Sequence, residues 1–234
     1  MGNILVCDDD KEIARAIGIY LEEAGYQVVL AYNGEEAIDC LANIKQIDLV
    51  IMDIMMPGLD GIEATKRIRE ENNIPIIMLS AKSEDEDKIA GLRIGADDYI
   101  TKPFNPEELV ARVQSQLRRA AMMIQQPKGE KTPKLTVGGL SLSEKDNVVN
   151  VDGRQVHLTP LEFNILKLLV QHAGQVFSSA EIYEKIWNDR PVDTGNLVAV
   201  HVRHIREKIE INTREPRYLK VIWGVGYKIE AENE

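Results

Sequence analysis

Residues 48–58 read Asp-Leu-Val-Ile-Met-Asp-Ile-Met-Met-Pro-Gly, and their first apolar run ends at the carboxylate of Asp53. An apolar run of this kind predicts a strand buried on both faces, as the strands of a parallel sheet are. Similar runs occur before and after it, separated by stretches whose apolar residues have helical spacing. The predicted strands cover residues 3–7, 27–31, 48–52, 75–79 and 97–100, and the predicted helices cover 11–24, 34–45, 61–71, 84–94 and 106–119. This alternation predicts an α/β fold, a doubly wound five-stranded parallel sheet, over residues 1–120.

A different pattern begins after residue 120. Residues 121–133 are rich in Gln, Pro, Lys and Gly with little to bury, which predicts a linker. Residues 134–234 begin with short strand-like pieces separated by turn signals, continue with three helical patterns and end in a hairpin pattern. This order predicts an α+β winged helix-turn-helix domain. Its strands are expected at 134–137, 140–143, 148–151 and 155–158, its helices at 160–173, 179–187 and 196–210, and its hairpin at 218–223 and 226–230.

The formal net charge of −10 is unevenly distributed. Residues 1–120 carry 23 acidic and 13 basic residues, whereas residues 121–234 carry 15 of each. A neutral second half can still place its cations on one face, so nucleic-acid binding is not excluded. No apolar run approaches the roughly 18 residues of a membrane span, and the N-terminus lacks a signal-peptide pattern. We therefore expect a cytoplasmic protein without a membrane partner, in which Cys7 and Cys40 are buried reduced thiols.

Polar residues gather where the predicted strands end. Asp8, Asp9 and Asp10 follow the first strand, Asp53 follows the third, Ser80 ends the fourth and Lys102 follows the fifth. Because the carboxyl ends of parallel strands share one edge of a sheet, these side chains are expected on a single rim. Clustered carboxylates suit Mg²⁺, and a carboxylate nucleophile with a metal site, a hydroxyl and an ammonium suits phosphoryl transfer. Each residue alone could be a helix cap or part of a turn, but their occurrence at successive rim positions favours a site.

The spacing of Asp8-Asp9, Asp53, Ser80 and Lys102-Pro103 resembles the receiver domain of bacterial response regulators, which has a flavodoxin-like fold. The resemblance implies that Asp53 is the phosphoacceptor and that a sensor histidine kinase is the donor. It implies that Asp8, Asp9, Asp53 and the carbonyl of Met55 bind Mg²⁺. It also implies that Ser80 and Tyr99 form the switch pair and that Lys102-Pro103 is a cis peptide.

Residues 95–104 resemble the subfamily whose receivers form homodimers on activation through the fourth helix, fifth strand and fifth helix. The resemblance implies two ion pairs between the protomers, Lys88–Glu108 and Asp98–Arg112. Around these pairs it implies an interface that includes Ile89, Leu92, Asp97 and Ala111.

The predicted helix at 196–210 has one apolar stripe, formed by Val198, Val202, Ile205 and Ile209. Its other face is expected to present Asn196, Val200 and Arg203, flanked by His201, His204 and Arg206. Such a face suits the major groove of double-stranded DNA, although an ordinary solvated helix face gives the same pattern.

Three motifs in the second half resemble the effector domain of OmpR/PhoB-type regulators, at residues 158–163, 200–208 and 223–227. The resemblance implies that 196–210 is the recognition helix and that the hairpin with Trp223 is the wing at the minor groove. It implies dimeric binding to tandem half-sites in promoter DNA, and contact of residues 188–196 with RNA polymerase. His204 and Trp223 are similar to the VanR-like branch of the family.

These features lead to the interpretation of a two-component response regulator that is not an enzyme. One alternative is a metal-dependent phosphatase that uses Asp8-Asp9-Asp10 as an Asp-x-Asp motif. Such enzymes generally have Thr or Val where this chain has Glu12, and they need a cap that the short loops do not provide. Another alternative is a binding module that works without phosphorylation, against which the intact set of rim residues argues.

Overall fold

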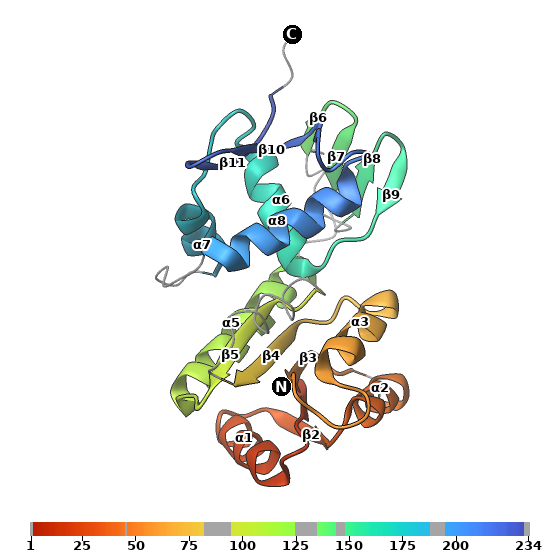
Figure 1. Ribbon diagram of the computed structural model, residues 1–234, viewed down its shortest axis with the longest axis vertical. Helices are drawn as coiled ribbons and strands as arrows, with labels where there is room; N and C mark the ends of the chain where they lie inside the picture. The colour runs from red at the N-terminus through yellow and green to blue at the C-terminus, as the bar shows by residue number, and fades with distance from the viewer. Residues whose placement is uncertain are drawn as a thin grey trace. The chain divides into compact units, whose positions relative to one another are not determined.

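The computed structural model describes residues 2–44, 46–81, 95–124, 135–143, 148–187 and 195–231 (Figure 1). The chain divides into two compact units, with the boundary between Ala120 and Ala121. Among the described residues, no helix is both long and apolar enough to cross a membrane.

The first unit contains a parallel sheet with the strand order β2-β1-β3-β4-β5. The chain enters at β1, forms β2 on one side of it and then returns to form β3 on the other side. This is the flavodoxin-like order, and the carboxyl ends of β1 and β3 flank the point where the direction of winding reverses. The strands are β1 (Asn3–Cys7), β2 (Gln27–Ala31), β3 (Leu49–Asp53), β4 (Ile76–Ala81) and β5 (Asp98–Lys102).

Helices cover both faces of this sheet (Figure 1). Alternate strand residues point to opposite faces, so two separate cores form. One core packs α1 (Lys11–Glu23) and α5 (Pro106–Ile124) against Val6, Ile51 and their neighbours. The other core packs α2 (Gly34–Asn43) and α3 (Gly61–Glu71) against Leu5, Met52 and their buried neighbours. The helix predicted at 84–94 lies outside the described residues.

The second unit begins with a four-stranded antiparallel sheet in sequential order, and three helices and a hairpin follow. Thr159 and Glu162 form a capping box at the start of α6, as their spacing suggests. The architecture is the winged helix-turn-helix that the sequence predicts. The elements are β6 (Leu135–Val137), β7 (Leu140–Ser143), β8 (Val148–Val151), β9 (Arg154–Val156), α6 (Pro160–Gln171), α7 (Ser179–Trp187), α8 (Gly195–Ile209), β10 (Leu219–Ile222) and β11 (Gly226–Ile229).

The main correction to the predicted elements concerns the linker. Helix α5 continues to Ile124, so the first residues of the segment predicted as linker, 121–133, are helical. The run Leu117-Arg-Arg-Ala-Ala-Met-Met consists of strong helix formers, and the Gln-, Pro- and Gly-containing residues begin only at Gln125. The rest of the predicted linker lies outside the described residues.

Candidate phosphoacceptor site and DNA-binding surface

Three carboxylates meet at the carboxyl edge of the parallel sheet. Asp8 follows β1 directly and Asp53 is the last residue of β3, and these two strands are paired with Cys7 opposite Met52. An oxygen from each of Asp8, Asp9 and Asp53 lies within 4.8 Å of the others. Asp8 and Asp53 are buried, whereas Asp9 is exposed. The cluster is therefore closed on the side of the sheet and accessible on the side of Asp9.

Lys102 supplies the positive charge of the cluster. It is the last residue of β5, and its Nζ lies 2.6 Å from Oδ2 of Asp8 and 2.8 Å from Oδ1 of Asp53. Ser80 lies on β4, which is the strand between β3 and β5 in the sheet, and its side chain is buried. Buried carboxylates are stable only when they are paired, so the ammonium of Lys102 balances part of their charge. The Lys102-Pro103 peptide is cis, which confirms that prediction.

The ionisation of Asp53 depends on this partner. Burial raises the pKa of the Asp53 carboxyl, the hydrogen bond from Lys102 opposes the rise, and Asp8 and Asp9 add to it. For Lys102, burial lowers the pKa of the ammonium, but the hydrogen bonds to Asp53 and Asp8 outweigh burial and raise it overall. Lys102 is therefore a firmly protonated cation beside a carboxylate whose charge is partly destabilised.

Asp10 has a different role from its two neighbours. Its carboxylate caps α1 by accepting hydrogen bonds from the backbone N–H groups of Glu12, at 2.9 Å, and Ile13, at 3.2 Å. Its own backbone N–H donates to Oδ1 of Asp8, at 3.0 Å. The sequence left open whether the Asp8–Asp10 run forms a helix cap, and in the structure Asp10 is the residue that caps α1. A carboxylate engaged as a cap does not fit the second acid of a phosphatase Asp-x-Asp motif.

The loop after β3 is held close to Asp53. The N–H of Gly61 donates to the carbonyl of Ile54, at 3.1 Å, and a Cβ at Gly61 would lie 1.9 Å from the carbonyl oxygen of Asp53. Only glycine fits there, so the start of α3 can lie against the backbone of Asp53. Met55 lies in this loop with an exposed side chain, and its carbonyl stays a predicted ligand.

The place of Asp97 in a dimer interface stays a prediction, but its carboxylate has partners within its own chain. Its carboxylate is buried within its own chain, where it accepts hydrogen bonds from Nη2 of Arg69, at 2.7 Å, and from the N–H of Ile76, at 2.9 Å. Arg69 also donates to the carbonyl of Gly95, at 2.8 Å. No local motif marks the contact of Arg69 with Gly95 and Asp97, because these two partners lie 26 and 28 residues further along the chain.

The other residues predicted at the dimer interface have mixed outcomes. Arg112 lies 3.1 Å from Asp98 and 2.9 Å from Glu108 of the same chain, so these ion pairs are intramolecular here. Ala111 is exposed on α5, and the pairing of Asp98 with a partner's arginine stays a prediction. Three predicted interface residues lie outside the described residues: Lys88, Ile89 and Leu92.

The surface of α8 differs from the prediction at three positions. His201, His204 and Val200 are buried, at 1%, 7% and 8% exposure. His201 and His204 fall at i+3 and i+6 from Val198, inside a buried stripe that is wider than the four apolar residues suggested. The ring of His201 lies 5.9 Å from that of Trp187, and Nδ1 of His204 lies 3.9 Å from Oε1 of Glu162. The two histidine side chains therefore pack inside the unit, and not on the exposed face of the helix where they were predicted, while the DNA contacts predicted for them and for Val200 stay predictions.

Exposed candidates for DNA contact are found on α8 and on the hairpin. Arg203 is exposed and lies 2.8 Å from Glu207 one turn further on, and Arg206 is half-buried and donates to the carbonyl of Thr213. Trp223 is 90% exposed at the turn between β10 and β11, next to Gly224, whose φ of 73° suits a tight turn. The side chain of Asn196 lies outside the described residues.

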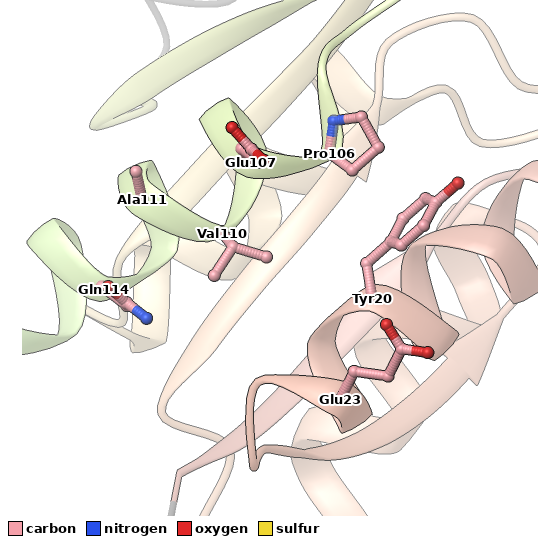
Figure 2. Close-up of a pocket in the computed structure, with 7 residues that line it drawn as sticks. All are labelled: Tyr20, Glu23, Pro106, Glu107, Val110, Ala111 and Gln114. Carbon is pink, nitrogen blue, oxygen red and sulfur yellow. The ribbon is translucent and has the colours of Figure 1, made fainter.

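A shallow groove of about 330 Å³ runs between α1 and α5. Figure 2 shows Tyr20 and Glu23 of α1 facing Pro106 and Val110 of α5, with Gln114 one turn further on. The lining contains no residue of the carboxylate cluster. The groove is therefore a separate surface feature and adds no group to the carboxylate cluster.

The comparisons with known proteins agree with both halves. Residues 4–114 match the response regulator receiver domain, and residues 153–229 match the C-terminal domain of transcriptional regulatory proteins. The chain is 42% identical to the regulatory protein VanR of Enterococcus faecium, over 97% of this chain and 98% of that protein. It is 41% identical to the alkaline phosphatase synthesis transcriptional regulatory protein PhoP of Bacillus subtilis, over 97% of this chain and 96% of that protein.

Solved structures share the fold over the whole chain. A RitR mutant has a TM-score of 0.77 at 21% identity, and the match covers 99% of this chain and 100% of that one. The two domain matches, the full-length relatives and the carboxylate cluster agree on one assignment. The chain belongs to the OmpR/PhoB-type response regulators, the transcription regulators that join a receiver domain to a DNA-binding domain.

Proposed function

We propose that this regulator is switched by phosphorylation of Asp53 in a Mg²⁺-dependent reaction with a sensor histidine kinase as donor. The observation that carries the proposal is the cluster itself, in which Lys102 contacts both Asp8 and Asp53 while Asp9 leaves the cluster accessible. A carboxylate nucleophile with a fixed cation and a metal site is what phosphoryl transfer requires, because positioning and charge neutralisation supply most of the catalysis.

In the proposed reaction a carboxylate oxygen of Asp53 attacks phosphorus, the bond from phosphorus to the donor's imidazole nitrogen breaks, and an acyl phosphate forms. Lys102, already 2.8 Å from Asp53, neutralises part of the roughly 1.5 to 2 negative charges that arrive. Ser80 donates its hydroxyl to a phosphoryl oxygen. The donor atoms of Asp8, Asp9 and Asp53, with the Met55 carbonyl, fit Mg²⁺, which when bound would offset the charge of the transferred group.

The proposed output follows from movement of the switch pair. When Ser80 turns toward the phosphoryl group, Tyr99 of β5 turns inward, which favours a homodimer through the face of β5 and α5. The dimer then presents two copies of α8 and two wings to tandem half-sites in promoter DNA. Arg203 and Arg206 contact the major groove and Trp223 contacts the minor groove, while residues 188–196 contact RNA polymerase. The chain therefore acts in the cytoplasm as a transcription regulator and not as a catalyst with turnover.

Intact-mass spectrometry with acetyl phosphate as donor tests the proposal. Wild type is expected to gain one phosphoryl group with Mg²⁺ and none after chelation, and Asp53→Asn is expected to gain none. Asp10→Asn is the matched control, because asparagine also caps helices and this variant should be phosphorylated like wild type. Failure of wild type to gain a phosphoryl group, or loss of phosphorylation in Asp10→Asn, would contradict the proposed site.

A further inference from the structure

The side chain of Glu210 joins the end of α8 to the base of the hairpin. The backbone N–H of Glu210 closes the helix on the carbonyl of Arg206, at 2.9 Å. Its carboxylate accepts three backbone hydrogen bonds: Oε2 from the N–H of Arg217, at 2.7 Å, and Oε1 from the N–H groups of Tyr218, at 2.9 Å, and Leu219, at 2.8 Å. Glu210 is only 7% exposed. A buried carboxylate that accepts three N–H bonds is a strong and directional link.

These three N–H groups lie where the chain enters β10. Leu219 is the first residue of that strand and is fully buried, and Tyr218 is 4% exposed. Residues 211–215, by contrast, form an exposed loop after α8. This loop is tied to α8 by the hydrogen bond from Arg206 to the carbonyl of Thr213, whereas the carboxylate of Glu210 binds the residues at which the hairpin begins.

Other contacts fix the same hairpin to the rest of the unit. Asp152, in the turn between β8 and β9, accepts hydrogen bonds from the hydroxyl of Tyr218, at 3.1 Å, and from Nη1 of Arg217, at 3.2 Å. On the opposite strand, Tyr227 and Phe177 exchange backbone hydrogen bonds of 2.8 and 2.9 Å. These contacts hold the hairpin in the unit, whereas Glu210 relates it directly to the helix that carries Arg203.

We propose that Glu210 is a positioning residue for DNA binding, which fixes the wing relative to α8 so that both elements meet one duplex at once. This inference rests on the proposed DNA-binding function of α8 and the hairpin. It gives a part in that function to a residue that is not itself proposed to contact DNA. When two elements are held on one rigid scaffold, binding of the first to a duplex places the second at a high effective concentration next to its own site. This advantage is lost when the spacing between the two elements varies. Loosening the wing should therefore weaken the minor-groove contact while the major-groove contact persists.

Glu210→Gln is a sharp probe, because it keeps the shape of the side chain and changes only its acceptors. The single amide oxygen is expected where Oε1 lies, since two donors converge there, and the amide NH₂ then faces the N–H of Arg217. Amide hydrogen exchange measured by NMR should show lost protection at Arg217, with Tyr218 and Leu219 retained. Glu210→Ala should lose protection at all three. Unchanged exchange at Arg217 in Glu210→Gln would contradict the proposed link.

Footprinting separates positioning from general stabilisation. The probe is a duplex selected from a random-sequence pool by acetyl-phosphate-treated wild type, with Glu215→Gln as control because Glu215 is an exposed carboxylate in the same loop. Glu210→Gln should bind about two- to tenfold more weakly, the effect of one hydrogen bond. It should lose hydroxyl-radical protection in the minor groove while guanine N7 protection in the major groove remains. Glu215→Gln should keep both.

The outcomes distinguish this inference from the function on which it rests. If wild type selects no duplex, DNA binding itself fails and the inference fails with it. If wild type protects both grooves and Glu210→Gln protects them equally, only the positioning role is overturned. A proportional loss in both grooves would assign Glu210 a purely structural role and would also overturn it.

Discussion

The ammonium of Lys208 on α8 lies 2.6 Å from Oε2 of Glu162 on α6, whose side chain is only 1% exposed. The same carboxylate accepts the N–H of Thr159, at 2.9 Å. Lys208→Met should therefore leave the buried carboxylate of Glu162 without its cation and destabilise the second unit. The expected loss of unfolding free energy is about 1 to 3 kcal/mol and not more, because Lys208 is partly exposed and solvent weakens the ion pair. Urea unfolding followed by Trp fluorescence would measure the shift. Lys228→Met, which breaks the pair with exposed Glu230, is the control and should cost under about 1 kcal/mol. Equal shifts would contradict the importance of the Glu162 pair.

Ionised Asp53 should destabilise the receiver unit in the absence of metal. Its pKa is raised from 3.8 by burial, so the folded chain holds this proton more tightly than the unfolded chain does. Stability then falls as pH rises from below 3.8 through the folded pKa. Asp53→Asn should melt at a higher temperature than wild type at pH 7, and the difference should shrink toward pH 4. Thermal melts of both proteins in chelator test this, with Asp60→Asn as a control, because Asp60 caps α3 and is not part of the cluster. A wild type more stable than Asp53→Asn at pH 7 would contradict it.

Trp223 should contribute to DNA affinity and hardly to stability. Because its side chain is 90% exposed, Trp223→Ala should change the free energy of unfolding by less than about 0.5 kcal/mol. Fluorescence anisotropy with a labelled selected duplex should show at least about fivefold weaker binding, as for an aromatic contact worth over 1 kcal/mol. Trp223→Arg should restore affinity at low salt. It should also make the binding constant fall more steeply with salt concentration, by the release of about one more counterion. Unchanged affinity in Trp223→Ala would remove the wing tip from the interface.

The two thiols should react at different rates. Burial, with a smaller contribution from Asp8, raises the pKa of the Cys7 thiol to about 12, and Cys7 is fully buried with Sγ 3.5 Å from Sδ of Met56. Burial also raises the pKa of Cys40, but this residue is partly exposed. Iodoacetamide at pH 8 should therefore modify Cys40 first and Cys7 only after urea is added, as read by peptide mapping. Equal rates in the native protein would contradict the buried position of Cys7.

Much of the receiver could be predicted from local patterns. The apolar runs define β1, β3 and β4 to within one or two residues, because these strands are buried on both faces and carry their signal in consecutive residues. Asp8, Asp53 and Lys102 could be placed together because parallel strands end at one edge, and the observed pairing of β1 with β3 supplies the neighbour relation that sequence left open.

The features that the sequence did not reveal come from non-local contacts. His201 and His204 were expected outside because histidine is polar, but Trp187 and Glu162 cover them from other helices. Asp97 was expected at an interface, yet Arg69, 28 residues earlier, binds it inside the chain. No sequence pattern marked Glu210, because its carboxylate oxygens accept hydrogen bonds from backbone N–H groups, which almost any residue supplies.

The net charge of the carboxylate cluster bears on the order in which a metal ion and a phosphodonor enter it. Among the described residues, the carboxylates of Asp8, Asp9 and Asp53 face the ammonium of Lys102, so that part of the edge has an excess of negative charge before a metal ion binds. This excess attracts a divalent cation and disfavours a phosphate anion that arrives first. On the proposed mechanism Mg²⁺ therefore enters before the phosphodonor, so that the resting charge of the receiver sets the order of binding.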